Sequence, residues 1–504
     1  MKYQYAQIPK TISYNSINDT VLSSGTYRIV KFGEEVITKK LSSLLETQLK
    51  RTHLGLEVGS SAYTTTSSHY FIRTQSLTEN SYILSVEDAV PILPQFFKGK
   101  GLKCGDIIIS KDGNIGEICI ADKDYPNYML SGALYKLPIR SHLKYYVFSY
   151  IKNKIFREQL DCLVPKGATL RHAKQLFLDC DIIFPKNSKG KIDNSVIKYA
   201  ELLTKAIINK ESLIKVRHQR IMQIIEKELK DNQLYSYEYK YPSLSQIKDT
   251  RIDAGQYCKE FKEKESFITN YKQGFTYLDK IGLKFIPGPS LEMKILKVRL
   301  DSEKPLPGYN RLITPTIITN YGVTTKNTYI GTPHKVKTIK KYDILFGESG
   351  TGRTMVFLDD DKYVINNAHA HVLRPEKCSN IMAISIRCIL QYYKEIGYTD
   401  YMTVGGAGGH LSPSYFDRVP VPNFPETINL KLKQLYYSES TIPSGLNVLE
   451  FEKVDNDFNK TAGIYELDKT CKILKERLSN LFDCIMNGKP VTIGFYPNNR
   501  ETVK

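Results

Sequence analysis

The chain carries one series of motifs twice, and this internal repeat constrains the fold more than any other feature of the sequence. Five stretches of the first half reappear in the second half in the same order, displaced by 230 to 241 residues. Alignment of residues 106–122 with 343–359 places Asp106 over Asp343 and Gly113 over Gly350. Chance does not produce such a collinear series, so the sequence predicts two copies of one domain.

Each copy consists mainly of short β-like runs separated by turns, followed by a segment of helical period. Both helical segments sustain a heptad pattern, at Ala200, Leu203, Ile207, Ile214 and Ile221 in the first and at Leu467, Cys471, Leu474, Leu478, Leu481 and Ile485 in the second. Lys210 and Arg217 interrupt the first pattern. We expect the two helices to pack on each other as a coiled coil, and the first to be roughly 50 Å long at 1.5 Å per residue. The alternative is that they are ordinary core helices of two tandem domains.

A Gly-rich stretch, Gly347 to Thr354, lies one residue away from the phosphate-binding pattern G-x-x-x-x-G-K-[ST], with Arg353 in place of the lysine. A phosphate loop has to open a helix, because the helix N-terminus supplies the N–H groups. Here a second β-like run follows instead, and the other copy of this stretch, "SKDGNIGE", lacks the pattern. The sequence therefore predicts a β-hairpin with a Gly-containing turn.

Charge favours a polyanionic partner, because 71 Lys and Arg residues exceed 53 Asp and Glu residues by 18. The alternative is a basic protein from an organism whose proteins are rich in lysine. No apolar run is long enough to span a membrane, and the N-terminus lacks a signal core, so we expect a cytoplasmic protein. Nine scattered cysteines without a C-x-x-C pair predict a reducing compartment and no structural metal. The dipeptide "PP" is absent, which excludes the N-P-P-[YF] signature of a fused DNA methyltransferase.

Six motifs are distributed over nearly the whole chain. They are "CGDIIISKDGNIGEICIAD", "KYDILFGESGTGRTMVFLD", "RIDAGQY", "GATL…DIIFP", "GGHL…VPVP" and "LFDCIMNGKPV". Together they resemble the specificity subunit of type I restriction–modification systems. The resemblance implies two target-recognition domains, each reading half of a split site in double-stranded DNA, and two antiparallel helices that set the distance between the halves. It also implies a non-catalytic chain that docks two methyltransferase subunits and the restriction subunits. S-adenosylmethionine, ATP and Mg²⁺ would be bound by those partners, and no cofactor by this chain.

This resemblance predicts an α+β fold with two pseudo-repeated β-rich domains and two long antiparallel coiled-coil spacer helices. The expected organisation is target-recognition domain 1 (1–190), spacer helix 1 (191–235), target-recognition domain 2 (236–425), an inserted connector (426–462), spacer helix 2 (463–490) and a tail (491–504). The heptad residues would form the coiled coil and the docking surface. The first copy departs from the family pattern, since "VLSSGTY" stands where the second has "RIDAGQY".

Candidate DNA-binding residues lie in polar or basic turns, because phosphates and base edges accept hydrogen bonds from such side chains. The first copy offers His69 and Arg73 in a hydroxyl-rich stretch, Lys111 and Asn114 in the hairpin, and Lys166, Arg171, His172 and Lys174 in a Gly-containing turn. The second copy offers Arg353, Asn367, His369, His410, Ser412 and Tyr415. Asn367, His369 and His371 alternate, so on a strand they would share one face. Such residues more often form a polar row that is hydrogen-bonded or solvated, and the alternative is a metal site.

Two rival functions remain open at this point. One is an enzyme, either a nuclease using the Glu292-x-Lys294 tripeptide or a nucleotide-binding protein using Gly347–Thr354. The other is a coiled-coil adaptor that holds proteins together without reading DNA. The enzyme predicts dependence of the isolated chain on ATP or metal, and the adaptor predicts no affinity for duplex DNA.

Overall fold

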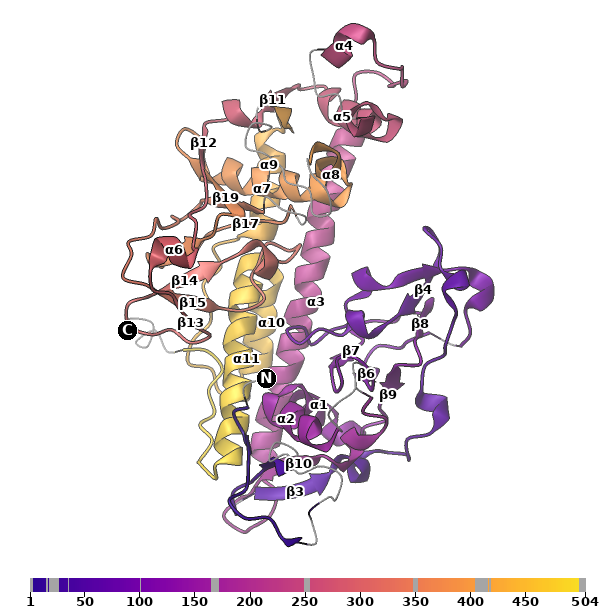
Figure 1. The fold of residues 1–504 in the computed structure, drawn as a ribbon, viewed down its shortest axis with the longest axis vertical. Helices are drawn as coiled ribbons and strands as arrows, with labels where there is room; N and C mark the ends of the chain where they lie inside the picture. The colour runs from indigo at the N-terminus through magenta and orange to yellow at the C-terminus, as the bar shows by residue number, and fades with distance from the viewer. Residues whose placement is uncertain are drawn as a thin grey trace. The chain divides into compact units, whose positions relative to one another are not determined.

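The structure, a computed structural model, describes residues 3–14, 17, 27–34, 36–99, 101–164, 172–248, 254–347, 352–403, 416 and 418–497. The chain forms two compact units. Unit 1 comprises Met1–Leu213, Thr441–Lys460 and Leu467–Lys504, and unit 2 comprises Ile214–Ser440 and Thr461–Glu466. Both units combine short strands with helices (Figure 1), so the predicted α+β class is confirmed. None of the helices described has the length and apolar character that crossing a membrane requires.

Unit 1 contains two three-stranded sheets and two strand pairs. The first sheet has the order β5-β4-β8 and the second β7-β6-β9. Strand β4 is parallel to β8, and the other pairs of named strands among the described residues of this unit are antiparallel. The strands are β1 (Ala6–Gln7), β2 (Ile29–Val30), β3 (Val36–Lys40), β4 (His69–Ile72), β5 (Val90–Ile92), β6 (Ile107–Ser110), β7 (Ile118–Ile120), β8 (Tyr128–Leu130), β9 (Leu134–Lys136) and β10 (Asp181–Pro185).

Unit 2 repeats this plan with one further strand in each main sheet. Its sheets have the orders β13-β15-β14-β18 and β12-β19-β16-β17, and β11 pairs with β20. The strands are β11 (Phe275–Tyr277), β12 (Leu283–Ile286), β13 (Leu300–Ser302), β14 (Tyr309–Ile313), β15 (Thr328–Gly331), β16 (Ile344–Gly347), β17 (Thr354–Val356), β18 (Val364–Asn366), β19 (Ala370–Pro375) and β20 (Pro420–Pro422).

Strand register confirms that the two units are copies of one design. In unit 1 the parallel pair β4–β8 places Phe71 opposite Met129, and in unit 2 the parallel pair β14–β18 places Arg311 opposite Val364. These are the same equivalences that the sequence alignment gives. The hairpins differ by one residue, because the pair Ile109↔Ile118 of unit 1 corresponds to Phe346↔Thr354 of unit 2. The ungapped alignment of this stretch therefore needs a one-residue gap in the turn.

The helices complete the layers around these sheets. Unit 1 contains α1 (Lys144–Lys152) and α2 (Lys154–Leu163), and unit 2 contains α4 (Leu244–Lys248), α5 (Lys259–Thr269), α6 (Met293–Leu296), α7 (Asn380–Glu395), α8 (Tyr398–Met402) and α9 (Glu426–Tyr436). The remaining three are α3 (Asn194–Asp231), α10 (Phe451–Thr461) and α11 (Ile464–Met486). The expected connector, 426–462, thus contains α9 and α10, while the domain boundaries drawn from the sequence stay a prediction.

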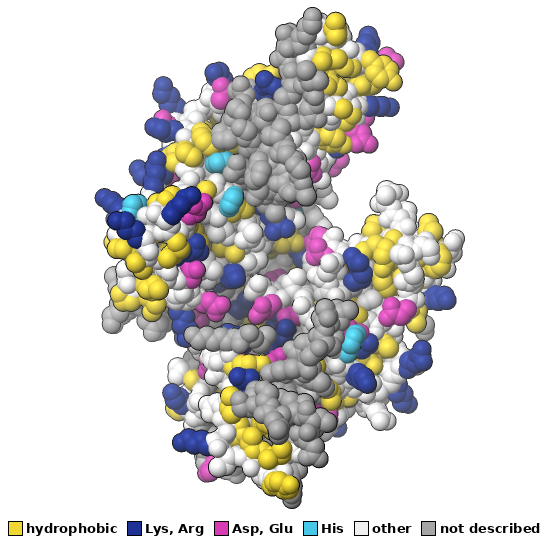
Figure 2. Space-filling model, viewed as in Figure 1, with side chains coloured by type: hydrophobic (Ala, Val, Ile, Leu, Met, Phe, Trp, Pro, Cys, Tyr) yellow, Lys and Arg dark blue, Asp and Glu magenta, His cyan; other side chains and the backbone are white. Residues whose placement is uncertain are grey.

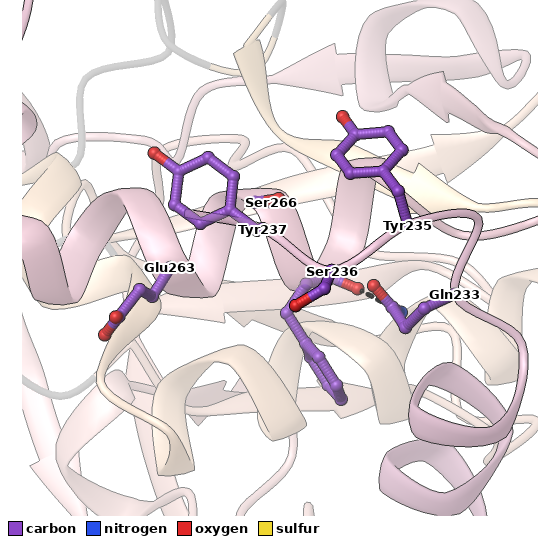
Figure 3. Close-up of a pocket in the computed structure, with 7 residues that line it drawn as sticks. Gln233, Tyr235, Ser236, Tyr237, Glu263 and Ser266 are labelled. Carbon is purple, nitrogen blue, oxygen red and sulfur yellow. Dashed lines mark hydrogen bonds between the residues drawn. The ribbon is translucent and has the colours of Figure 1, made fainter. Parts of the chain in front are cut away.

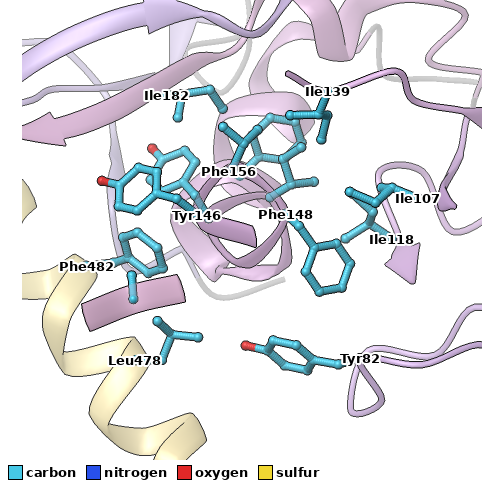
Figure 4. Packing of buried hydrophobic residues seen from close by; sticks show 14 of the residues in the cluster. Tyr82, Ile107, Ile118, Ile139, Tyr146, Phe148, Phe156, Ile182, Leu478 and Phe482 are labelled. Atoms are coloured by element: carbon cyan, nitrogen blue, oxygen red, sulfur yellow. The ribbon is translucent and has the colours of Figure 1, made fainter. Parts of the chain in front are cut away.

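Helices α3 and α11 run antiparallel in unit 1. The Tyr199 hydroxyl on α3 donates to the carbonyl of Gly494, beyond the end of α11, whereas Glu211 further along α3 pairs with Lys475 at 2.6 Å. The predicted antiparallel helix pair is therefore confirmed. Its heptad side chains join the main core of the unit, where Phe482 of α11 packs 5.6 Å from the ring of Tyr146 on α1 (Figure 4).

Candidate nucleic-acid interface

The turn of the β6–β7 hairpin in unit 1 brings separately predicted segments together. The Nδ1 atom of His172 lies 2.6 Å from the Asp112 carboxylate, and Ala173 donates its backbone N–H to the carbonyl of Lys111 at 2.8 Å. Gly113 adopts a positive φ of 68°, and a Cβ added there would lie 3.8 Å from Thr74 Oγ1. Three candidate segments, around residues 73, 111–114 and 172–174, thus form one surface.

Asp112 is the side chain that organises this surface. Its carboxylate receives an ion pair from Lys111 at 2.5 Å as well as the contact from His172. The His172 side chain is 57% exposed, and its Nδ1 contacts Asp112. The other ring nitrogen, Nε2, can therefore bond a different partner. Asn114 and Lys174 are exposed beside it. Sequence reasoning missed Asp112, because nothing in the local sequence links a hairpin turn to a loop about sixty residues away.

His69 and Arg73 lie along and just beyond strand β4, each held by a different neighbour. The His69 ring packs 4.8 Å from the ring of Phe97 and its Nδ1 lies 3.1 Å from the Ser68 hydroxyl. The Arg73 guanidinium lies 5.9 Å from the Tyr63 ring centre and donates to the Gln75 side chain at 3.1 Å. Both side chains are half-buried, so they are positioned rather than free in solvent.

In unit 2 the corresponding hairpin confirms the sequence prediction and excludes a nucleotide loop. Strand β16 pairs antiparallel with β17, so the residues that follow Thr354 form a strand and not a helix. Residues 348–351 lie outside the described part of the chain. Arg353 donates to the carbonyl of Ile318 at 3.1 Å and is half-buried.

The prediction that Asn367, His369 and His371 share one strand face is wrong. Residues 367–369 form a turn in which Ala370 donates its N–H to the Asn367 carbonyl, and this turn leads from β18 into β19 of the other sheet. His369 is exposed, whereas His371 is buried against Phe285, 4.8 Å between ring centres. The alternation of a strand cannot continue through a turn, so the two histidines point to different surroundings. Asn367 and His369 stay candidates as turn residues.

Five further candidates cannot be placed, because Lys166, Arg171, His410, Ser412 and Tyr415 lie outside the described residues. The DNA-binding role of the whole set stays a prediction.

Each hairpin is supported from behind by a buried cation. In unit 1, Lys152 of α1 donates to the carbonyls of Thr78 and Ile118 and pairs with Glu117 at 3.3 Å. In unit 2, Arg387 of α7 donates to the carbonyls of Asn320 and Thr354 at 2.9 and 3.0 Å. Ile118 and Thr354 are the first residues of equivalent strands, β7 and β17. The repeat therefore extends to a polar device that fixes the hairpin, and a surface site gains precision from such support.

The predicted coiled-coil residues are buried within the chain itself. Eight of them belong to the core of unit 1: Ala200, Leu203, Ile207, Cys471, Leu474, Leu478, Leu481 and Ile485. The other three, Ile214, Ile221 and Leu467, are buried as well. Burial raises the pKa of the Cys471 thiol to about 12, as expected for a cysteine that packs as an apolar residue. Their role in docking other subunits stays a prediction.

The lysine that interrupts the first heptad pattern is also buried. Lys210 contacts Asp455 of α10 at 2.7 Å and the Asn459 side chain at 2.6 Å, and burial lowers its pKa. Arg217 donates to the carbonyl of Ala462 within unit 2, and burial lowers its pKa too. Both interruptions are therefore polar contacts inside a unit and not breaks of the helix.

No constellation supports the enzyme rivals in the part of the chain that the structure describes. Glu292 pairs with Lys294 at 2.7 Å, and both are exposed. No three His, Cys, Asp or Glu side chains among these residues could hold a metal ion together. An open pocket of about 540 Å³ lies between the end of α3 and α5 (Figure 3). Glu263 contributes a carboxylate to its lining, and Tyr235 and Tyr237 contribute two rings from one segment. Its lining includes Ser236, Ser266 and Glu263, but among the described contacts no hydrogen bond joins either serine hydroxyl to the carboxylate, as an activated nucleophile would require.

Comparisons with known proteins find similarity to solved structures. No protein-family model matches the chain, and no curated protein sequence matches it. The chain is similar to S subunits of type I restriction–modification systems. The S subunit from M. genitalium is 14% identical with a TM-score of 0.39, over 90% of this chain and 98% of that one. The HsdS subunit from Thermoanaerobacter tengcongensis is 12% identical with a TM-score of 0.27, over 91% and 98%.

A third match comes from a structure concerned with complex assembly and conformational transition of the type I R-M system. It is 10% identical with a TM-score of 0.28, over 92% of this chain and all of that one. These three structures all come from type I restriction–modification systems.

Proposed function

We propose that this chain is the DNA-specificity subunit of a type I restriction–modification complex, and that it reads a two-part site without carrying out chemistry. The observation that carries the proposal is the repeated register of the parallel pairs β4–β8 and β14–β18. A chain that builds the same domain twice can present two related readers, and the net charge of +18 suits a polyanion.

The helices fit the task of holding two readers. Helix α3 contributes residues to both units, and its 38 residues extend about 57 Å at 1.5 Å per residue. One turn of duplex DNA spans about 34 Å, so a helix of this length suits half-sites separated by more than one turn. The surface around Asp112 offers the polar side chains and backbone that base edges and phosphates require.

The chemistry and the energy source belong to partner subunits in this proposal. Two methyltransferase subunits would bring S-adenosylmethionine, and restriction subunits would bring ATP and Mg²⁺. The chain would work in the cytoplasm, where the DNA is.

Methylation mapping tests the proposal. We expect that co-expression of this chain with the methyltransferase encoded beside it, in a host without DNA methylation, modifies one two-part motif with a fixed unspecified gap. Genome-wide sequencing of modified bases measures this. Exchange of residues 1–190 for those of a related chain should change one half of the motif and leave the other half unchanged.

The control is the methyltransferase expressed without this chain, which should modify no such motif. A stable complex that modifies nothing would remove the specificity role and favour the adaptor. ATP hydrolysis or metal-dependent cleavage by the isolated chain would favour the enzyme.

A further inference from the structure

The two units present different chemistry at one topologically equivalent edge. In unit 2 the edge strand β13 pairs with β15, with Leu300 opposite Gly331. In unit 1 the equivalent neighbour of β5 is an isolated bridge between Tyr63 and Ile92. Ile92 and Gly331 are equivalent, because β4–β5 and β14–β15 share their register. Residues 58–68 of unit 1, "VGSSAYTTTSS", therefore correspond to the segment around β13.

The chemical contrast between these segments is large. Residues 58–68 contain no charged residue. Residues 292–305 of unit 2, "EMKILKVRLDSEKP", contain three Lys and one Arg in addition to three acidic residues. Across residues 291–340 there are nine Lys and Arg against three Asp and Glu, so this stretch carries a third of the chain's net charge.

Strand pairing gathers these cations along one edge. Because β13 and β15 are antiparallel, Lys297 before β13 lies at the same end as Lys335 and Lys337 after β15. Val336, between those two lysines, packs on the apolar cluster that contains Leu296. Lys304 after β13 and Lys326 before β15 border the opposite end. We call the edge formed by residues 293–304 and 326–337 the basic edge.

The ammonium groups of the basic edge are available. Five lysines of this edge are exposed and form no ion pair within the described residues: Lys297, Lys304, Lys326, Lys335 and Lys337. Lys294 and Arg299, in contrast, pair with Glu292 and Asp301. Apolar side chains are exposed between the cations, with Met293 and Leu300 each 56% accessible. Figure 2 shows Lys and Arg side chains beside apolar ones over α6 and the neighbouring strands.

We propose that the basic edge of unit 2 binds the phosphate backbone of duplex DNA, and that it thereby supplies a salt-dependent part of the affinity that the equivalent edge of unit 1 does not supply. Phosphates attract unpaired ammonium groups, and each phosphate neutralised releases counterions. The hydroxyl-rich segment of unit 1 contacts the backbone through neutral donors, which release few counterions. This inference rests on the proposed DNA-reading function and assigns different roles to its two copies.

Salt-dependent binding tests the inference. The triple variant K297Q/K304Q/K335Q is co-purified with the methyltransferase. It is titrated against a fluorescent duplex of unrelated sequence from about 50 to about 300 mM salt, a range that brackets physiological ionic strength. We expect binding weakened by about tenfold or more at 0.1 M salt and a log–log salt slope reduced by about 3. The methylated motif should stay the same, because phosphate contacts carry no sequence information.

Two controls separate the causes. The variant K31Q/K189Q/K191Q removes the same charge from exposed lysines of unit 1 and should lower the slope by less than about 1. The variant K297R/K304R/K335R keeps the charge and should bind as the wild type does. If the first triple variant behaves like the unit 1 control, the inference is wrong, and the lysines serve only to keep the edge strand from pairing. If the wild-type complex binds and modifies no DNA at all, the proposed function fails instead.

Discussion

Replacement of Arg387 by methionine is expected to destabilise unit 2 by about 3 kcal/mol or more and to leave unit 1 unchanged. Arg387 is fully buried, and its guanidinium donates to the carbonyls of Thr354 and Asn320. It also lies 4.8 Å from the centre of the Tyr436 ring. Methionine fills much of the same volume but donates no hydrogen bond, so the buried carbonyl of Thr354 loses a donor at about 1–3 kcal/mol, and the carbonyl of the exposed Asn320 loses another. The lost cation–π contact adds about 1–2 kcal/mol.

Hydrogen exchange followed by mass spectrometry measures this effect unit by unit. A loss of about 3 kcal/mol corresponds to exchange that is roughly a hundredfold faster for amides that open with the whole unit. The amide of Phe357, which donates to Asp343, reports on unit 2, and the amide of Ala121, which donates to Asp106, reports on unit 1.

The matched control is Arg299→Met in the same unit. Arg299 is partly exposed and pairs with the exposed Asp301, so its loss should cost less than about 0.5 kcal/mol. Equal exchange rates for the two variants would show that the buried guanidinium does not hold the hairpin.

The repeat and the helix pair were predictable because both rest on apolar periodicity. Ala200 and Leu474 occupy heptad positions, and both are completely buried in the core of unit 1. The strand pairs were predictable because turns with Gly113 and Gly350 mark the same hairpin in each copy. Two signals that agree between copies are stronger than either one alone.

The polar details were not predictable, because their partners lie far away in the sequence. Asn367 to His371 look like a strand, and nothing in "NNAHAH" marks the turn that the switch between two sheets imposes. Asp112 and His172 are about sixty residues apart, and no local pattern links them. Lys210 looks like a break in the heptads, yet its partner Asp455 lies on α10, in a segment that the first copy lacks.

Replacement of Asp455 by alanine is expected to destabilise unit 1 by about 3–5 kcal/mol, because it leaves the buried Lys210 ammonium without its counter-charge. Lys210 is fully buried, and Asp455 is 2% exposed. The same carboxylate accepts from the Asn459 side chain at 2.9 Å and from the hydroxyl of Tyr496, whose pKa burial and Asp455 raise. Three donors thus depend on one buried carboxylate.

The double variant K210M/D455L tests whether the loss comes from the unpaired charge. An apolar pair of similar volume should recover the part of the stability that the unpaired ammonium removes, since a buried ion pair gains little net free energy over well-packed apolar side chains. Exchange of the amides of α3 in unit 1 measures each variant. The control is Asp457→Ala on α10, where Asp457 and Lys460 pair in solvent, so its loss should leave the exchange rates almost unchanged.

If the double variant stays as unstable as D455A, the loss belongs to the other donors and not to Lys210. Y496F then separates them, because it removes the hydroxyl that donates to Asp455 and leaves the ion pair in place. A large cost of Y496F would mean that the C-terminal segment, through Tyr496, fixes α10. A small cost would leave Asn459 as the contact that holds α10 in register with α3, because it bonds both Lys210 and Asp455.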